Sequence, residues 1–274
     1  MLSELHKKQF VIFYLTCFAV NFYWVFDNDL LMSQNQPLIF VNSLDLTRNL
    51  LMLSNIQHSL VTSLELCFLF DLVYFLFPFI LGYTILKNTK GQSIMSLTTS
   101  IVAFVYGIFY SMFSYFSFTY FISLVFIPLI FYKRSNEGFY FNLHFMRLIF
   151  LGIFVSTGLW KIRTGAVFNV EQMSSILLQQ HKQVLINEPE GWYSLFIFFI
   201  IKNRIFSYML YLSAVLIEIS FAIGFFTKRY DDLLFILFCI FLLMDFFIMQ
   251  INYFNWFVFS GLFYYSKFNL SKQI

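Results

Sequence analysis

The sequence predicts an all-α protein, a polytopic membrane helix bundle of about eight transmembrane helices with an amphipathic helix on its outer face. The first observation is composition: 60% of the 274 residues are hydrophobic and 11% are charged, whereas a soluble domain carries roughly 25% charged residues. The second is length, because several apolar runs approach or exceed the roughly 20 residues with which a helix crosses a bilayer. The third is the absence of barrel-type alternation, which leaves helices as the spanning structure. We expect residues 1–274 to form a single transmembrane domain in contact with the lipid bilayer.

Eight apolar runs predict the spans. The uncharged run Ile94–Tyr132 is nearly twice the length of one span, so we expect two helices with a tight turn near Ser111–Ser117. The run Leu233–Tyr265 has a polar corner at Gln250, Asn252 and Asn255, and seven spans follow if this run is one tilted helix. The predicted spans are Phe10–Phe26, Leu66–Leu86, Ile94–Met112, Ser114–Tyr132, Phe141–Trp160, Ile205–Phe226, Leu233–Met249 and Tyr253–Ser266.

Two segments between spans are too long to be plain turns. Asp27–Ser63 is rich in Asn, Ser and Leu, and we interpret it as a loop lying against the bundle. Gly165–Ile200 begins with a roughly helical apolar stripe that is broken at Glu188–Gly191, and it predicts the amphipathic helix. The stripe consists of Val170, Met173, Ile176, Leu177 and Leu178.

The basic residues predict the orientation. With a cytoplasmic N-terminus, ten of the 17 basic residues fall on the inner side, and each short inner loop receives a pair. This predicts a multi-pass protein of the cell membrane with both termini in the cytoplasm. The inner residues are Lys7, Lys8, Lys87, Lys90, Lys133, Arg134, Lys228, Arg229, Lys267 and Lys272, and the outer acidic residues are Asp27, Asp29, Asp45, Glu65, Glu171, Glu188 and Glu190.

Five charged residues inside the apolar runs are candidates for chemistry: Asp71, Arg147, Lys161, Glu218 and Asp245. A charge in the hydrocarbon costs at least about 2.5–3.5 kcal/mol on insertion scales, so each needs a partner or a function. For Arg147 and Asp71 the plain alternative is an ion pair that holds the bundle together. Glu218 and Asp245 lie deeper in their runs and require a cation, a shared proton or a ligand.

Lys161 ends its span within "STGLWKIRTGAVFN", two residues before Arg163. One interpretation is a lysine whose stem follows the helix while its ammonium reaches the headgroups. The other is a desolvated amine that acts as a base. The sequence has no CxxC, no histidine pair with metal-ligand spacing, no P-loop and no HExxH. It therefore predicts neither a metal site nor a nucleic-acid partner.

The stretch "LHFMRLIFLGIFVSTGLWKIRTGAVFNVEQ" resembles the HTTM domain, the membrane domain shared with vitamin K-dependent gamma-carboxylase. The "LIEISFAIGFFTKR" segment matches the family's next element through Glu218 and its basic pair, and "NWFVFSGLFYY" loosely echoes the closing segment. The resemblance covers residues 143–265. The motif positions are filled by Thr157, Gly158, Lys161, Ile162, Gly165, Glu218, Lys228 and Arg229.

The resemblance implies that Lys161 is a candidate catalytic base, because the matching carboxylase lysine deprotonates vitamin K hydroquinone. Glu218 is the second candidate catalytic residue, and we expect it to line the same outward-facing cavity. A quinone is therefore a possible cofactor, and the candidate residues to bind it are Arg147, Arg163 and Asp245. Gamma-carboxylation itself is not expected, because no histidine stands near Gln250–Ile251, where the family has one. The large extra-membrane domain that grips the carboxylase's protein substrate is also missing.

Size and topology are similar to those of the stand-alone sporulation-delaying protein B family, whose members act with a small partner protein in maturing a secreted peptide toxin. The leading hypothesis is a bacterial membrane protein that assists production or maturation of a secreted peptide, toxin, antimicrobial or protein, at an outward-facing site around Lys161. A small accessory protein and the secreted peptide are the expected partners. Two alternatives stay open: a quinone-dependent carboxylase-like or redox membrane enzyme, and a non-catalytic scaffold subunit of a membrane complex.

Overall fold

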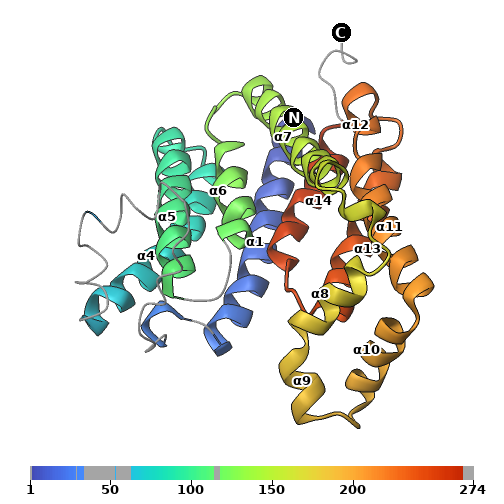
Figure 1. Cartoon of the computed structure of the whole chain (residues 1–274). Helices are drawn as coiled ribbons and strands as arrows, with labels where there is room; N and C mark the ends of the chain where they lie inside the picture. Colours follow the sequence, from blue (N-terminus) through green and yellow to red (C-terminus); the bar gives the residue numbers. More distant parts are fainter. Residues whose placement is uncertain (1, 29, 34–52, 54–62, 114–117, 268–274) are drawn as a thin grey trace. The chain divides into compact units, whose positions relative to one another are not determined.

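A computed structural model describes residues 2–28, 30–33, 53, 63–113 and 118–267 (Figure 1). Within these residues all regular structure is helical and no strand occurs. The chain divides into two compact units, which are described separately. Unit 1 comprises residues 1–146 and 254–274, and unit 2 comprises residues 147–253.

Unit 1 is built around the long helices α1 (Leu2–Asn28), α4 (Leu64–Leu86) and α5 (Gln92–Phe113), which pack in sequence order. The first part of α7 (Asn136–Arg163) also belongs to it. The shorter elements are η1 (Leu31–Ser33), η2 (Phe118–Phe121), α6 (Ile122–Leu129), η4 (Phe254–Phe259) and α14 (Ser260–Tyr265).

The core of unit 1 is aromatic. Phe18 and Tyr74 pack edge to face with ring centroids 5.8 Å apart, and Tyr74 stacks on Tyr106 at 3.9 Å. Offset and edge-to-face ring pairs each add about 0.5–1.5 kcal/mol beyond the burial of their area. The many Phe and Tyr residues of this unit are therefore explained in part by packing between its helices.

Unit 2 contains the second part of α7 and the helices that follow it along the chain. A break at Phe221–Ala222 separates α11 from α12. Helix α11 packs against α8, α10 and α13, so it is the central helix of this unit. The elements are η3 (Ala166–Phe168), α8 (Gln172–Gln180), α9 (Lys182–Asn187), α10 (Trp192–Lys202), α11 (Arg204–Ser220), α12 (Ile223–Phe226) and α13 (Asp231–Met249).

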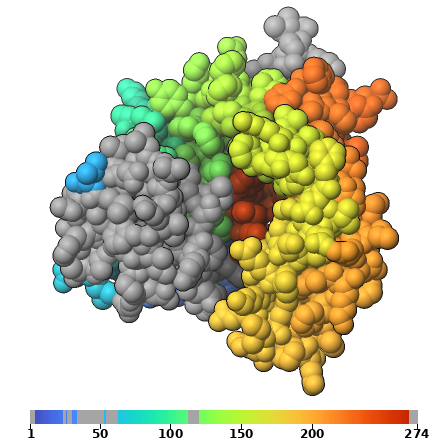
Figure 2. Space-filling model, in the orientation of Figure 1, coloured from blue at the N-terminus to red at the C-terminus, as the bar shows by residue number. Residues whose placement is uncertain are grey.

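The predicted amphipathic segment is three helices, α8 to α10, whose yellow-to-orange surface is visible in Figure 2. Of the predicted stripe, Met173 and Leu177 are buried, whereas Val170 and Leu178 are exposed. Positions 173 and 177 are four residues apart and share one face of α8, while 178 lies about 100° further round the helix. The break predicted at Glu188–Gly191 lies between α9 and α10.

Five of the predicted spans coincide with helices that are long and apolar enough to cross a membrane: α4, α5, α7, α11 with α12, and α13. Helix α1 covers the whole predicted first span, Phe10–Phe26. These helices support the prediction of a membrane helix bundle. The Asp27–Ser63 loop and the Ser111–Ser117 turn lie largely outside the described residues.

The other two predicted spans differ from the structure. In Ser114–Tyr132 the described part is η2 followed by α6, which has eight residues and contains Pro128. An α-helix of that length is about 12 Å long, less than half of a bilayer's hydrocarbon core. Tyr253–Ser266 is η4 followed by the six-residue α14. The polar corner is present, because Gln250 ends α13 with φ 51°.

Candidate functional site

Helices α7 and α11 bring Lys161 and Glu218 together, although the two residues are 57 positions apart. The Lys161 Nζ lies 2.7 Å from the Glu218 Oε1. The lysine is in the last turn of α7 and the glutamate in the last turn of α11. The two charges that the sequence singled out on separate spans therefore form one ion pair within unit 2.

Two glycines flank this pair and place it. A Cβ on Gly158 would lie 2.9 Å from Ile219 Cγ1 and 3.2 Å from the Glu218 Cβ, so only glycine admits this approach of α11. Gly165 has φ 76° and follows the end of α7, where its N–H donates to the Ile162 carbonyl at 3.0 Å. This is the left-handed conformation that glycine adopts most readily after a helix.

The pair is asymmetric in exposure and in hydrogen bonding. The Lys161 side chain is 26% exposed, whereas that of Glu218 is 2% exposed. The second carboxyl oxygen, Oε2, is buried and has no hydrogen-bond partner among the described residues. The lysine Nζ also lies 5.8 Å from the centroid of the Tyr211 ring, within cation–π range. The Lys161 end of the pair is therefore partly accessible to solvent, whereas the Glu218 end is buried and carries the unpaired Oε2 acceptor.

Asp245 on α13 is the second carboxylate of unit 2 that the sequence singled out. Among the described residues it forms no hydrogen bond or ion pair with Lys161 or Glu218. The Asp245 side chain lines a small cavity of about 30 Å³ together with Met173, Ile217 and Ile248. Because a water molecule needs roughly 10–15 Å³, this cavity has room for a water or two.

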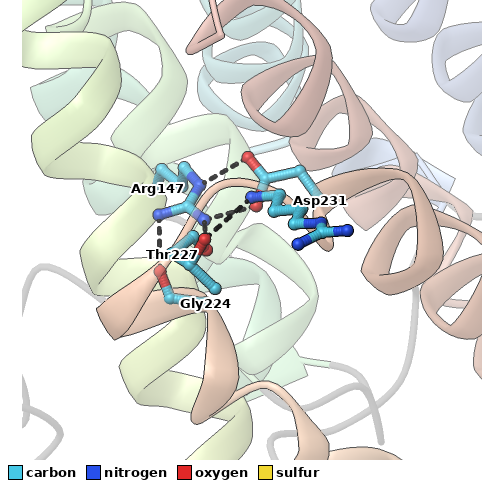
Figure 3. Close-up of polar contacts among 5 residues, drawn as sticks. Arg147, Gly224, Thr227 and Asp231 are labelled. Carbon is cyan, nitrogen blue, oxygen red and sulfur yellow. Dashed lines mark hydrogen bonds and ion pairs between the residues drawn. The ribbon is translucent and has the colours of Figure 1, made fainter.

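Arg163 and Arg147 do not join the pair. Arg163 is exposed, and its guanidinium lies 5.3 Å from the centroid of the Trp160 ring. Arg147 is 1% exposed and forms an ion pair with Asp231 at the start of α13 (Figure 3). Its Nε donates to Asp231 Oδ2 at 3.1 Å and its Nη1 to the Gly224 carbonyl at 2.9 Å.

The Arg147–Asp231 pair holds the turn between α12 and α13 against α7. The Arg147 Nη2 also donates to the Thr227 carbonyl at 3.5 Å. Burial and the nearby Arg147 guanidinium lower the pKa of Lys228, while Asp231 opposes that shift. These contacts use the hydrogen-bond donors of the buried Arg147 guanidinium, so it has no pair of free N–H groups with which to bind a ligand. We therefore interpret the Arg147–Asp231 pair as a structural clamp.

Asp71 lies in unit 1 and is likewise satisfied. Its carboxylate accepts hydrogen bonds from the Tyr106 hydroxyl at 2.6 Å and from the backbone N–H groups of Leu31 and Met32 at 3.1 and 3.0 Å. It therefore anchors η1 to α4. Within the described ranges, no three His, Cys, Asp or Glu side chains are placed to share a metal ion.

Three residues of unit 2 make contacts in the structure that their sequence pattern does not predict. Asp231 looks like an ordinary first-turn acid, yet it is 0% exposed. Tyr211 is one of 17 tyrosines. His181 is 2% exposed, and its Nε2 lies 2.8 Å from the Ile248 carbonyl near the end of α13. The place of Asp231 in the polar stretch 227–232, between two apolar runs, was the available signal for it, and nothing comparable marks the other two.

The sequence placed Lys161 and Glu218 in one candidate site with Arg147, Arg163 and Asp245 around it. In unit 2 the first two are hydrogen-bonded to each other, Asp245 lines a separate small cavity, and the two arginines have other partners. Comparison of the chain with protein-family models, with curated proteins and with solved structures gives no match.

Proposed function

We propose that this chain is an HTTM-like multi-pass membrane protein that assists the production or maturation of a secreted peptide or protein, with Lys161 and Glu218 as its proton-transfer pair. The substrate class comes from the resemblance in size and topology to the sporulation-delaying protein B family. The reactive pair comes from the geometry of α7 and α11. The proposed side of the membrane for this site is the outer one.

The observation that carries the proposal is the half-satisfied carboxyl of Glu218. A purely structural buried ion pair is stable only when its remaining hydrogen-bonding capacity is filled, as it is around Arg147. Here Oε1 is bonded at 2.7 Å and the buried Oε2 has no partner in the described part of the chain. A buried, unfilled acceptor beside an amine is typical of a site that awaits a ligand or a proton.

This geometry assigns different tasks to the two side chains. The short bond holds one exchangeable proton between the amine and the carboxyl, so Lys161 is already engaged as a donor. Glu218, whose carboxyl is buried, then takes up a proton through this bond, and Lys161, which is partly exposed, is the side chain that exchanges protons with a substrate. In this arrangement Lys161 acts as a base only together with Glu218.

A complementation experiment in the native host tests the proposal. Deletion of the gene should remove a peptide from the culture medium, as detected by mass spectrometry, and the wild-type gene should restore it. The variant Lys161→Ala should fail to restore it at equal abundance in the membrane. Lys182→Ala is the matched control, because Lys182 is an exposed lysine of the same unit, and it should restore the peptide fully.

Other outcomes separate the alternatives. Full restoration by Lys161→Ala would leave a scaffold subunit as the function and would contradict the proposed pair. An unchanged peptide profile on gene deletion, together with a quinone extracted from the purified protein and reducible in its presence, would replace the proposal with a quinone-dependent enzyme.

A further inference from the structure

A basic pocket of unit 1 lies far along the chain from Lys161 and is used by none of the chemistry above. Its volume is about 380 Å³, within the range of small-ligand sites. The start of α1, the end of α4 and the turn before α7 form its walls. We call it the basic pocket, and the lining residues that matter here are Glu4, Lys7, Lys8, Asn88, Arg134 and Ser135.

The cations of the basic pocket are held in position by neutral groups. Lys7 is 5% exposed, and its Nζ donates to Gln92 Oε1 at 3.1 Å and to the Arg134 carbonyl at 3.0 Å. The Arg134 guanidinium donates to the Asn88 side chain and to the Asn88 carbonyl, both at 2.8 Å. Such contacts orient the cations before any ligand arrives.

The charges in the basic pocket are unbalanced. Lys8 pairs with Glu4 at 3.2 Å, but neither Lys7 nor Arg134 has a carboxylate within ion-pair distance among the described residues. Burial lowers the pKa of Lys7 to about 8, the Arg134 charge adds to that effect and Glu4 opposes it. A lysine that only marks the cytoplasmic side of a membrane protein has no reason to be buried, because the orientation rule depends on charge near the membrane and not on burial.

An apolar face of α1 continues from the basic pocket. Glu4 and Lys8 are followed at helical spacing by Ile12, Leu15, Ala19 and Tyr23, which line a shallow groove of about 530 Å³. Ile12 is 55% exposed and Tyr23 is 76% exposed. At 1.5 Å per residue the groove runs about 16 Å from Ile12 to Tyr23, close to the roughly 15 Å of hydrocarbon in one leaflet.

We propose that the basic pocket binds the phosphate of an anionic phospholipid, with Lys7, Lys8 and Arg134 as the cationic contacts and an acyl chain lying along the α1 groove. Arginine and lysine are the side chains that recognise phosphate groups, and a basic site at the end of a membrane helix lies at headgroup depth. The shared chemistry is a phosphate, so inorganic phosphate is the competing source.

The test uses the full-length protein, purified in a mild detergent and titrated with phosphatidylglycerol, with phosphatidylcholine or with inorganic phosphate. Binding is read by native mass spectrometry for the lipids and by the shift of the thermal unfolding midpoint for all three. We expect phosphatidylglycerol to bind at least roughly tenfold more tightly than phosphatidylcholine, because phosphatidylcholine carries, beside the same phosphate, a choline cation that the basic residues repel. Millimolar phosphate should produce no shift.

The variant Lys7→Gln/Arg134→Gln should lose this preference for phosphatidylglycerol. Its matched control is Lys87→Gln/Lys90→Gln, which removes the same charge from exposed lysines that do not line the pocket and should keep the preference. If the first variant does not fold, Lys8→Glu serves instead, because Lys8 is 42% exposed and its reversal should weaken binding in the same direction.

Three results would overturn the proposal. Equal loss in the test and control variants would show non-specific attraction to charge. A shift with inorganic phosphate alone would make the ligand a soluble phosphate compound. Equal affinity for the two lipids would show that the basic pocket does not distinguish an anionic headgroup from a zwitterionic one.

Discussion

At residue scale, Gly158 shows how a small side chain positions a charged one. It lies one turn before Lys161 on α7, and α11 passes it so closely that Ile219 Cγ1 would be 2.9 Å from a Cβ at this position. The atom that would have to move belongs to a β-branched side chain next to Glu218. The glycine therefore determines how near the carboxyl can come to the amine.

We predict that Gly158→Ala destabilises unit 2 by about 1–3 kcal/mol, the usual range for overpacking, and disrupts the function assigned to the pair. Gly152→Ala on the same helix is the control, because its Cβ would meet no atom closer than 3.9 Å. That variant should be neutral or stabilise the helix by up to about 1 kcal/mol. Unfolding midpoints of the two purified variants give the comparison, and equal stability would refute the close-approach argument.

The sequence located this site only in part. The spacing of Gly158, Lys161 and Gly165 marked one helix end, and Glu218 stood out as a charge within an apolar run. Their pairing could not be read from the sequence, because it depends on the rotation of α7 and α11 about their axes. Arg147 illustrates the same limit: the sequence made it a candidate to bind a cofactor near Lys161, whereas its partner is Asp231 at the start of α13.

At the scale of elements, the short helix α6 receives hydrogen bonds to its backbone carbonyls from side chains of a neighbouring helix. Pro128 lies inside α6 and cannot donate a hydrogen bond to the preceding turn. Polar side chains of α5 bond other carbonyls of α6 and so hold this short helix against α5: Ser100 donates to the Val125 carbonyl at 2.7 Å and Ser96 to the Pro128 carbonyl at 2.6 Å. An apolar run predicts that a segment is shielded from water. It does not predict whether the segment forms one long helix or a short helix held by hydrogen bonds to its neighbours.

The clamp between α7 and the α12–α13 turn provides a prediction at this scale. Arg147→Met should destabilise the protein by about 3–5 kcal/mol, since it leaves the fully buried Asp231 without its cation. Arg147→Met/Asp231→Leu should recover most of that loss, because it removes both charges together. Unfolding midpoints in detergent measure both variants. A mild effect of the single substitution, or no recovery in the double, would contradict the clamp.

At the scale of the whole molecule, composition was sufficient to predict helices of membrane length. Among the described residues, five helices satisfy the length and hydropathy that a span requires. The count of eight is not confirmed, because the described parts of two predicted spans are the short elements η2 with α6 and η4 with α14. Some carbonyls of these elements accept hydrogen bonds from side chains of unit 1. The polar side chains that make this possible, such as Ser123 bonding to the Asn255 carbonyl at 2.9 Å, are inconspicuous in the sequence.

The two proposed sites of this protein belong to different units. The basic pocket belongs to unit 1 and the Lys161–Glu218 pair to unit 2. The first is proposed to bind a lipid phosphate and the second to transfer protons. Loss of either site should leave the other intact, so their variants can be scored independently.

In the function proposed above, the Lys161–Glu218 pair transfers protons and is not only a structural bond. Glu218→Gln tests it most directly, because glutamine keeps the shape of the side chain and an oxygen for Lys161 but cannot exchange a proton. We predict an unchanged amount of protein in the membrane and a fall in secreted peptide of roughly a hundredfold, the scale of general acid–base catalysis. Secretion at the wild-type level by Glu218→Gln would contradict the account.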